Sequence, residues 1–181
     1  MPTVEPIEGR VLEWLKTVTW GKHSVLELGA GRFEKLAAIN SSLRVGIEIC
    51  QQYIDEFPAP GVRQICGDMR EFDVVLKDNG IEREWDCVLM IDALEHISFE
   101  DGVPLLAKLK RHTKSICVFC PLGCYEQHDD PWGYNNPHQA HKSEWWPADF
   151  ERLGFQSVVE HPGFHSPEQG AIFAQWNRHD S

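Results

Sequence analysis

The stretch "VLELGAGRFEKL", from Val25 to Leu36, reads as a buried strand, a turn built on glycines and the start of a helix. Its first four residues are apolar apart from Glu27, "GAG" cannot continue a strand, and "RFEKL" has helical spacing. Gly29 and Gly31 would let the backbone approach a ligand closely, and the start of the helix offers free N–H groups. The stretch therefore predicts a ligand cradle. A glycine turn needed only for helix–strand packing is the alternative.

On both sides of this stretch, short apolar runs alternate with amphipathic ones. The spacing predicts an opening helix at residues 6–18, within an N-terminal segment of residues 1–20. Gly102 and Pro104 predict that the helix before the fifth strand begins near Val103. The predicted strands are "SVLEL", "LRVGIEI", "GVRQICGD", "EWDCVLMID", "KSICVFCP", "FQSVVEH" and "GAIFAQWN". This order predicts an α/β fold with a mostly parallel sheet, helices on both faces and an antiparallel pair at one edge.

The length of 181 residues is typical of one domain, so residues 1–181 are expected to share one core. Residues 121–143 interrupt the pattern, because they are rich in aromatic residues and histidine and have no clear period. A connection of that length in a compact domain is usually a functional lid or a disordered link, and its aromatic content favours a lid.

The composition limits the partners. Seventeen basic and twenty-eight acidic residues give a formal charge of -11, which opposes binding to long nucleic acid or to an anionic membrane. We expect a small-molecule substrate and a cytoplasmic location, since the sequence shows no leader and no long apolar run. The scattered cysteines fit a reducing compartment. Cys117 and Cys120 would face opposite sides of a strand and therefore could not share a zinc ion.

An acidic residue strengthens the cradle hypothesis. Glu48 ends the next predicted strand, about 20 residues after the glycines, where a carboxylate can bind the hydroxyls of a ribose. Dinucleotide-binding turns usually carry a third glycine, whereas here Arg32 and Phe33 follow Gly31. The ligand is therefore predicted to contain a ribose, and the missing third glycine favours an adenosine ligand other than a dinucleotide, a choice that the rest of the chain decides.

Four blocks, "ELGAG", "GIE", "CGDM" and "WDCVLMIDALEHI", occur in this order and together resemble class I S-adenosylmethionine-dependent methyltransferases, including bacterial and phage members. The similarity runs through residues 24–177. It implies a Rossmann-like fold with a seven-stranded sheet in the order 3-2-1-4-5-7-6, and S-adenosyl-L-methionine as the cofactor. Phe33 departs from the family, which often has glycine at that position, and this puts the path of the loop in doubt.

The resemblance also implies roles for single residues. Glu27 would organise the methionine end of the cofactor, Glu48 would bind both ribose hydroxyls, and Asp68 would accept from the adenine amino group. Ile49 and Met69 would contact the adenine. The full set of implied cofactor-binding residues is Glu27, Gly29, Ala30, Gly31, Glu48, Ile49, Asp68, Met69, Ile91 and Asp92. The last two would present main-chain oxygen to the ammonium group.

Two histidines are candidates for the chemistry. His96 follows the fourth strand in "ALEHI", and His141 opens "HKSEW" in the lid. A histidine there would accept a proton from the methyl acceptor, with a capping or packing role as the alternative. In small-RNA 3′-terminal methyltransferases and ubiquinone-pathway O-methyltransferases, a similar "E-x-x-E-H" supplies metal ligands. That likeness makes Glu95, His96 and His141 an alternative metal site.

The predicted function is methyl transfer from S-adenosylmethionine to an oxygen or nitrogen of a small polar, sugar-like or nucleoside-like molecule. Two alternatives stay open. One is metal-assisted 2′-O-methylation of a terminal nucleotide, and the other is a non-catalytic S-adenosylmethionine-binding sensor or partner protein.

Overall fold

The computed structural model describes residues 7–179, with residues 7 and 8 described by their backbone only. The predicted helix start at residue 6 and the two ends of the predicted domain lie outside these residues. Within residues 7–179, no helix combines the length and the apolar character needed to cross a membrane.

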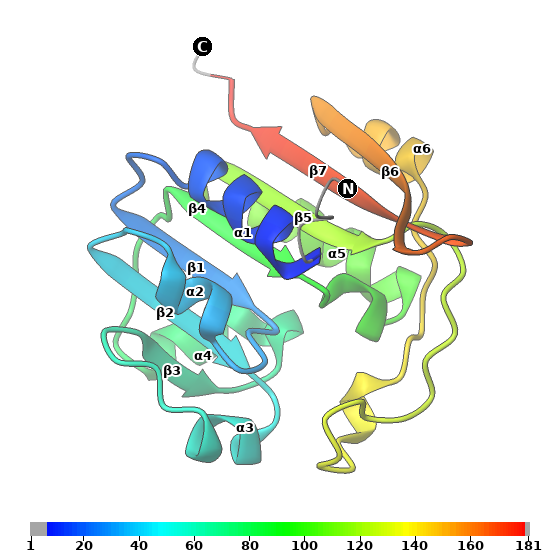
Figure 1. Ribbon diagram of the computed structural model, residues 1–181. Coiled ribbons are helices and arrows are strands. Elements are labelled where there is room, and N and C mark those ends of the chain that lie inside the picture. The colour runs from blue at the N-terminus through cyan, green and yellow to red at the C-terminus, as the bar shows by residue number, and fades with distance from the viewer. Residues whose placement is uncertain (1–6, 180–181) are drawn as a thin grey trace.

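Seven strands form one sheet in the order β3-β2-β1-β4-β5-β7-β6 (Figure 1), as predicted. The strands are β1 (Ser24–Leu28), β2 (Leu43–Glu48), β3 (Arg63–Cys66), β4 (Cys87–Ile91), β5 (Ser115–Pro121), β6 (Ser157–Ser166) and β7 (Gln169–Asn177). The first five are parallel, and β7 runs antiparallel to both β5 and β6. The parallel strands therefore deliver their carboxyl ends to the same edge of the sheet, which is where open α/β sheets bind ligands.

Helices cover both faces of the sheet. They are α1 (Ile7–Val18), α2 (Glu34–Ala38), α3 (Gln51–Glu56), α4 (Phe72–Asp78), α5 (Phe99–Leu109) and α6 (Pro147–Arg152). Three short 3-10 turns, η1 (Met69–Glu71), η2 (Leu94–His96) and η3 (Pro137–Gln139), lie between them. Residues of α1 and α2 pack on one face, and residues of α4, α5 and α6 pack on the other.

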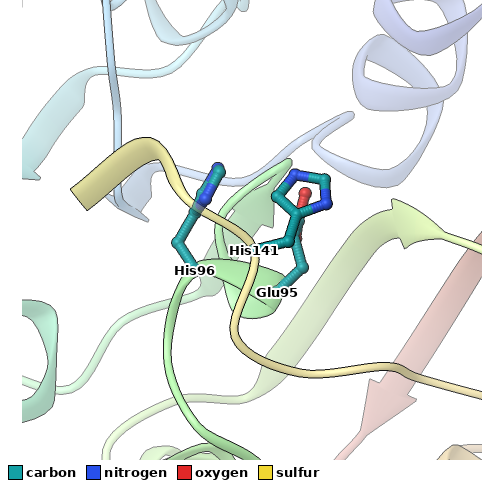
Figure 2. Close-up of side chains that lie close together, drawn as sticks. All are labelled: Glu95, His96 and His141. Atoms are coloured by element: carbon teal, nitrogen blue, oxygen red, sulfur yellow. The ribbon is translucent and has the colours of Figure 1, made fainter. Parts of the chain in front are cut away.

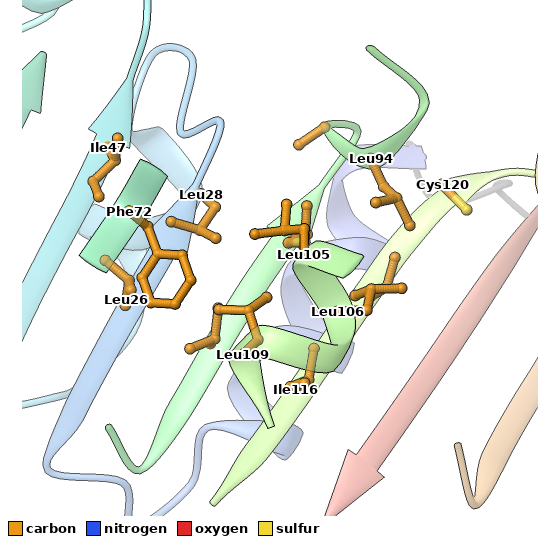
Figure 3. Packing of buried hydrophobic residues seen from close by; sticks show 14 of the residues in the cluster. Leu26, Leu28, Ile47, Phe72, Leu94, Leu105, Leu106, Leu109, Ile116 and Cys120 are labelled. Atoms are coloured by element: carbon orange, nitrogen blue, oxygen red, sulfur yellow. The ribbon is translucent and has the colours of Figure 1, made fainter. Parts of the chain in front are cut away.

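Alternating side chains of the buried strands separate the core into two layers. Leu26 and Leu28 of β1 belong to the layer under α4 and α5, together with Leu105 and Leu106 of α5 (Figure 3). Val25 points into the opposite layer, under α1 and α2. The cysteines of β5 follow the same rule, since Cys117 lies in one layer and Cys120 in the other. The expectation that these two thiols cannot meet at one ion is confirmed.

The start of α5 corrects the sequence analysis. The helix begins at Phe99, four residues before the predicted start at Val103. The Ser98 hydroxyl caps it by accepting from the Asp101 N–H at 3.2 Å, and this cap outweighs the hydrogen bond that Pro104 cannot make. Gly102 has a packing role, because a Cβ there would lie 2.7 Å from the Trp145 ring.

The doubt about Phe33 is resolved by its conformation. Its φ is 61°, so the chain takes the left-handed conformation that a glycine would provide. That conformation costs about 1–2 kcal/mol for a residue with a side chain. The Phe33 ring is fully buried, which contributes about 1.5–3 kcal/mol and offsets the strain. The ring occupies the space beside Gly46 of β2, where a Cβ would lie 2.6 Å from it.

We expect Gly46→Ala to lower the free energy of unfolding by about 1–3 kcal/mol, the usual effect of overpacking a core. The matched control is Gly9→Ala in α1, where a new methyl group would meet nothing within 4 Å. That control should be neutral or should stabilise by about 0.5–1 kcal/mol, since alanine favours helix. Urea unfolding measures both variants, and equal stabilities would show that Phe33 does not need the space at Gly46.

Candidate active site

A cavity of about 360 Å³ lies at the carboxyl ends of the strands, between them and the lid. Between β5 and α6 the lid has η3 as its only helical turn among the described residues. Every site residue predicted from the sequence lines the cavity: Glu27, Gly29, Ala30, Gly31, Glu48, Ile49, Asp68, Met69, Ile91, Asp92, Glu95, His96 and His141. Fold topology therefore brings together residues that span more than a hundred positions of the chain.

Glu48 organises the glycine turn. Its carboxylate accepts from the Gly31 N–H at 2.8 Å with one oxygen and from the Cys50 N–H at 2.9 Å with the other. The Gly29 N–H donates to the main-chain oxygen of Ile47 at 2.9 Å. Burial raises the pKa of Glu48, and these main-chain donors oppose that rise. The turn after β1 is thus tied to the end of β2.

Glu27 is the buried acid at the floor of the cavity. Its side chain is 1% exposed, and its Oε2 has no hydrogen-bond partner. Burial raises the pKa of Glu27 to about 8, while the charge of Lys35 opposes the rise. A buried carboxyl oxygen without a partner is costly, so it marks a position where a donor or a cation from a ligand would be stabilising.

Asp68 is more fully engaged than the sequence analysis assumed. Its Oδ1 accepts from the Arg70 N–H at 2.9 Å, which makes it the N-cap of η1. The Arg70 guanidinium also binds both carboxylate oxygens and reaches Asp101 at 3.0 Å. The bonds from Arg70 hold the pKa of Asp68 below its usual value. Asp68 therefore acts as a cap in the structure, and a role in adenine binding would have to share oxygens that already accept.

Asp92 stands at the end of β4 in the left-handed conformation, with φ 47°. Its N–H donates to Phe119 of the neighbouring β5 at 2.9 Å, and its carboxylate lies 3.8 Å from the Lys35 ammonium. Its position in the recess of the cavity raises the pKa of Asp92 to about 6, and Lys35 opposes the rise. The backbone thus turns sharply at the residue predicted to offer main-chain oxygen.

Glu95, His96 and His141 meet at the other end of the cavity. The side chains extend in the same direction from η2 and from the lid (Figure 2), and one ligand atom of each lies within 4.8 Å of the others. The two imidazole rings are 4.9 Å apart between centroids. Main-chain bonds hold the segments together, because the Glu95 carbonyl accepts from the Lys142 N–H at 2.7 Å. The predicted meeting of His96 with His141 is present in the structure.

The electrostatics of this cluster favour neutral groups. Burial, together with the neighbouring His141, lowers the pKa of His96 to about 4, and burial lowers the pKa of His141. Burial also raises the pKa of Glu95 well above its ordinary value, and its Oε2 has no partner. The Nδ1 atoms of His96 and His141 face the carbonyls of Ala140 and Tyr125, at 3.4 and 2.5 Å. Each imidazole therefore keeps its Nε2 for another partner.

Two cavity-lining residues were missed from the sequence. His165 of β6 stacks on Tyr125 at 5.8 Å between ring centroids, and its Nε2 is buried without a partner. Trp132 of the lid touches the glycine turn, because a Cβ on Gly31 would lie 2.9 Å from its ring. No local motif marks either residue, since only the folding of the hairpin and of the lid brings them to the cavity.

No protein family model matches the chain, and no curated protein matches it in sequence. Solved structures match its fold. The N-terminal domain of EvdMO1 with SAH bound has a TM-score of 0.64 at 17% identity, covering 97% of this chain and 82% of that one. The DhpI–SAH complex has a TM-score of 0.64 at 16% identity, and the match covers 96% of this chain and 86% of that one. The small RNA methyltransferase HEN1 has a TM-score of 0.60 at 19% identity, and the match covers 97% of this chain and 26% of that one. The chain has the fold of class I methyltransferases, as the sequence blocks predicted.

Glu27→Gln should change how stability depends on pH. Between the unfolded pKa of about 4.5 and the folded pKa of about 8, only the unfolded chain ionises Glu27, so the parent loses up to about 1.4 kcal/mol per pH unit. The variant lacks this loss, so its stability relative to the parent should rise from pH 4.5 and level off above pH 8. Urea unfolding at pH 5, 6.5 and 8 measures the difference. A difference that stays constant with pH would contradict the raised pKa.

Proposed function

We propose that the protein is a methyltransferase that uses S-adenosyl-L-methionine and transfers the methyl group to an oxygen or nitrogen of a small polar, sugar-like or nucleoside-like molecule. The observation that carries the proposal is the unpartnered, buried Glu27 oxygen beside the glycine turn of a methyltransferase fold. Two of the structural neighbours, EvdMO1 and DhpI, are described with SAH bound. The net charge of -11 supports a small acceptor over long nucleic acid.

The residues present fit this cofactor. Glu27 offers its free oxygen to the ammonium group, and main-chain oxygen at the end of β4 lies along the same wall. Glu48 uses one lone pair of each oxygen on the loops and keeps the others for the ribose hydroxyls. Ile49 and Met69 supply apolar surface for the adenine. Asp68 is a weaker candidate for the adenine amino group, because Arg70 already occupies its oxygens.

When bound, S-adenosylmethionine supplies a methyl group that is activated by a sulfonium charge. The chain has to align the acceptor with it and keep water out, which can contribute about 7–11 kcal/mol in favourable cases. The lid covers the cavity and serves the second purpose. The Nε2 of His96 or of His141 takes the proton that the acceptor loses. With its pKa near 4, His96 is fully deprotonated at neutral pH but is a weak base, so it suits an acceptor whose proton is already acidic.

One observation favours a second candidate, metal-assisted methylation of a terminal nucleotide. Glu95, His96 and His141 place a carboxylate and two imidazoles within 4.8 Å of one another, and the Glu95 Oε2 has no other partner. Neutral imidazole and carboxylate suit a divalent transition ion, and three protein ligands leave positions open for substrate oxygens. Two structural neighbours are HEN1 methyltransferases, one of them acting on small RNA.

Cofactor binding is the first test. Thermal unfolding should shift upward with S-adenosylmethionine and with SAH but not with NAD; a ligand at 100 times its dissociation constant stabilises by about 2.7 kcal/mol. Glu48→Gln should weaken SAH binding by about 1.5–3 kcal/mol, because it removes a charged acceptor. Asp68→Asn is the comparison and should have a smaller effect, since Arg70 holds that carboxylate. A shift with NAD alone would contradict the proposal.

The role of the histidines is decided by metal binding and by pH. If the cluster holds an ion, Mn²⁺ should bind the wild type in a calorimeter, His141→Ala should lose that binding, and a chelator should abolish turnover. If the histidines act as bases, Mn²⁺ should not bind and a chelator should have no effect. Activity should then be lost as pH falls through a value below 6.5, because burial lowers the pKa of His96 and of His141. Full activity of both His96→Ala and His141→Ala would assign a packing role to the pair.

A further inference from the structure

The tip of the lid reaches across the cavity to the glycine turn. Trp132 lines the cavity together with Gly31 and Glu48, two residues that we assign to the cofactor. A Cβ placed on Gly31 would lie 2.9 Å from the Trp132 ring, so the ring rests directly on the backbone of the turn. The tip of the lid therefore covers the cavity at the glycine turn.

An aromatic cluster on α3 holds the tip in this place. The ring of Tyr53, which is fully buried, lies 5.0 Å from the Trp132 ring and 5.4 Å from the Tyr134 ring, both in edge-to-face geometry. Phe57 adds a further contact to Tyr134 at 6.0 Å. Each such pair contributes about 0.5–1.5 kcal/mol beyond its burial in other proteins, so the tip has a built docking surface.

Hydrogen bonds within the tip fix the conformation that makes this contact. The Asp130 carboxylate accepts from the N–H groups of Trp132, Tyr134 and Asn136, at 2.8, 3.0 and 3.1 Å. Three bonds to one carboxylate fix the turn that presents the indole to the cavity. Trp132 is thus presented by a defined loop.

Arg32 connects the tip to the glycine turn. Its guanidinium lies 4.4 Å from the Trp132 ring centroid and 5.0 Å from that of Phe57. Among the residues that the structure describes, Arg32 forms no ion pair, and its Nε is buried without a hydrogen-bond partner. The Arg32 guanidinium therefore interacts with the ring faces by cation–π contacts, and these contacts stabilise the position of the indole over the turn.

We infer that Trp132 is a residue of the cofactor site that keeps the bound cofactor from leaving. The inference rests on the proposed function. The indole, backed by Arg32 and Tyr53, covers the glycine turn in the cavity, so it slows the release of the cofactor and of its product until the tip moves away. The rate of cofactor exchange then depends on the contacts between the lid and α3. A tip that merely packs against α3 would affect folding without affecting exchange.

The test measures the dissociation rate of SAH by surface plasmon resonance on the immobilised full-length protein. Trp132→Ala should raise this rate by roughly tenfold, which corresponds to about 1.4 kcal/mol. The dissociation constant should rise less, because an open wall also speeds association. Trp132→Phe keeps a ring on Tyr53 and should lie between Trp132→Ala and the wild type. Thermal unfolding verifies that each variant is folded.

The matched control is Trp146→Ala, which lies beyond the lid at the N-cap of α6. Its side chain is half exposed and does not line the cavity, so SAH should dissociate from this variant at the wild-type rate. Dissociation from Trp132→Ala and Trp132→Phe within twofold of the wild type would overturn the inference and leave the proposed function intact. Absence of SAH binding to the wild type itself would overturn both.

Discussion

The rest of the site depends on the hydrogen bonds that the Glu48 carboxylate accepts. It bridges two main-chain N–H groups, one from the glycine turn after β1 and one from the start of α3 after β2. Because the side chain is only 4% exposed, water cannot replace these donors. The turn is therefore oriented by the neighbouring strand. The position of the lid tip depends on this turn, since Trp132 packs on the Gly31 backbone that Glu48 holds.

Four acids of the cavity divide into two kinds. Glu48 and Asp68 are satisfied by the protein itself, through main-chain donors and through Arg70. Glu27 and Glu95 are buried, and each leaves one oxygen without a partner. Burial raises the pKa of both, so folding alone leaves each of them poorly satisfied. In the proposed function, Glu27 faces the methionine end of the cofactor and Glu95 belongs to the histidine cluster, so ligands there would supply the missing partners.

Much of the site could be predicted because its signals are local. The glycine turn, the position of Glu48 at a strand end and the "ALEHI" run lie beside buried strands whose apolar pattern is clear. The parallel sheet then collects them at one edge. One prediction failed although the deciding signal was also local. The early start of α5 comes from the Ser98 cap, which outweighs the signal of Pro104.

The features that were missed depend on contacts between segments that are distant in the sequence. The engagement of Asp68 depends on a guanidinium two residues away that also reaches α5 through Asp101. His165 and Trp132 come from a hairpin and a lid whose sequences carry no period, so their direction is set by packing alone. Phe33 is an intermediate case. The sequence shows that a glycine is absent, but only the contact with Gly46 explains how the turn is kept.

The two ends of the lid are held by different forces, and this gives its movement a direction. Near the histidines, main-chain bonds from Lys142 and Ser143 to the Glu95 carbonyl, at 2.7 and 3.2 Å, fix the lid to η2. At the tip, edge-to-face ring contacts connect Trp132 and Tyr134 to Tyr53 of α3, and each such pair is worth only about 0.5–1.5 kcal/mol. We assign the opening of the lid to this end, in line with the inference about Trp132. If the proposed function holds, cofactor exchange at the tip leaves the contacts between the lid and η2 in place, and His96 and His141 stay together.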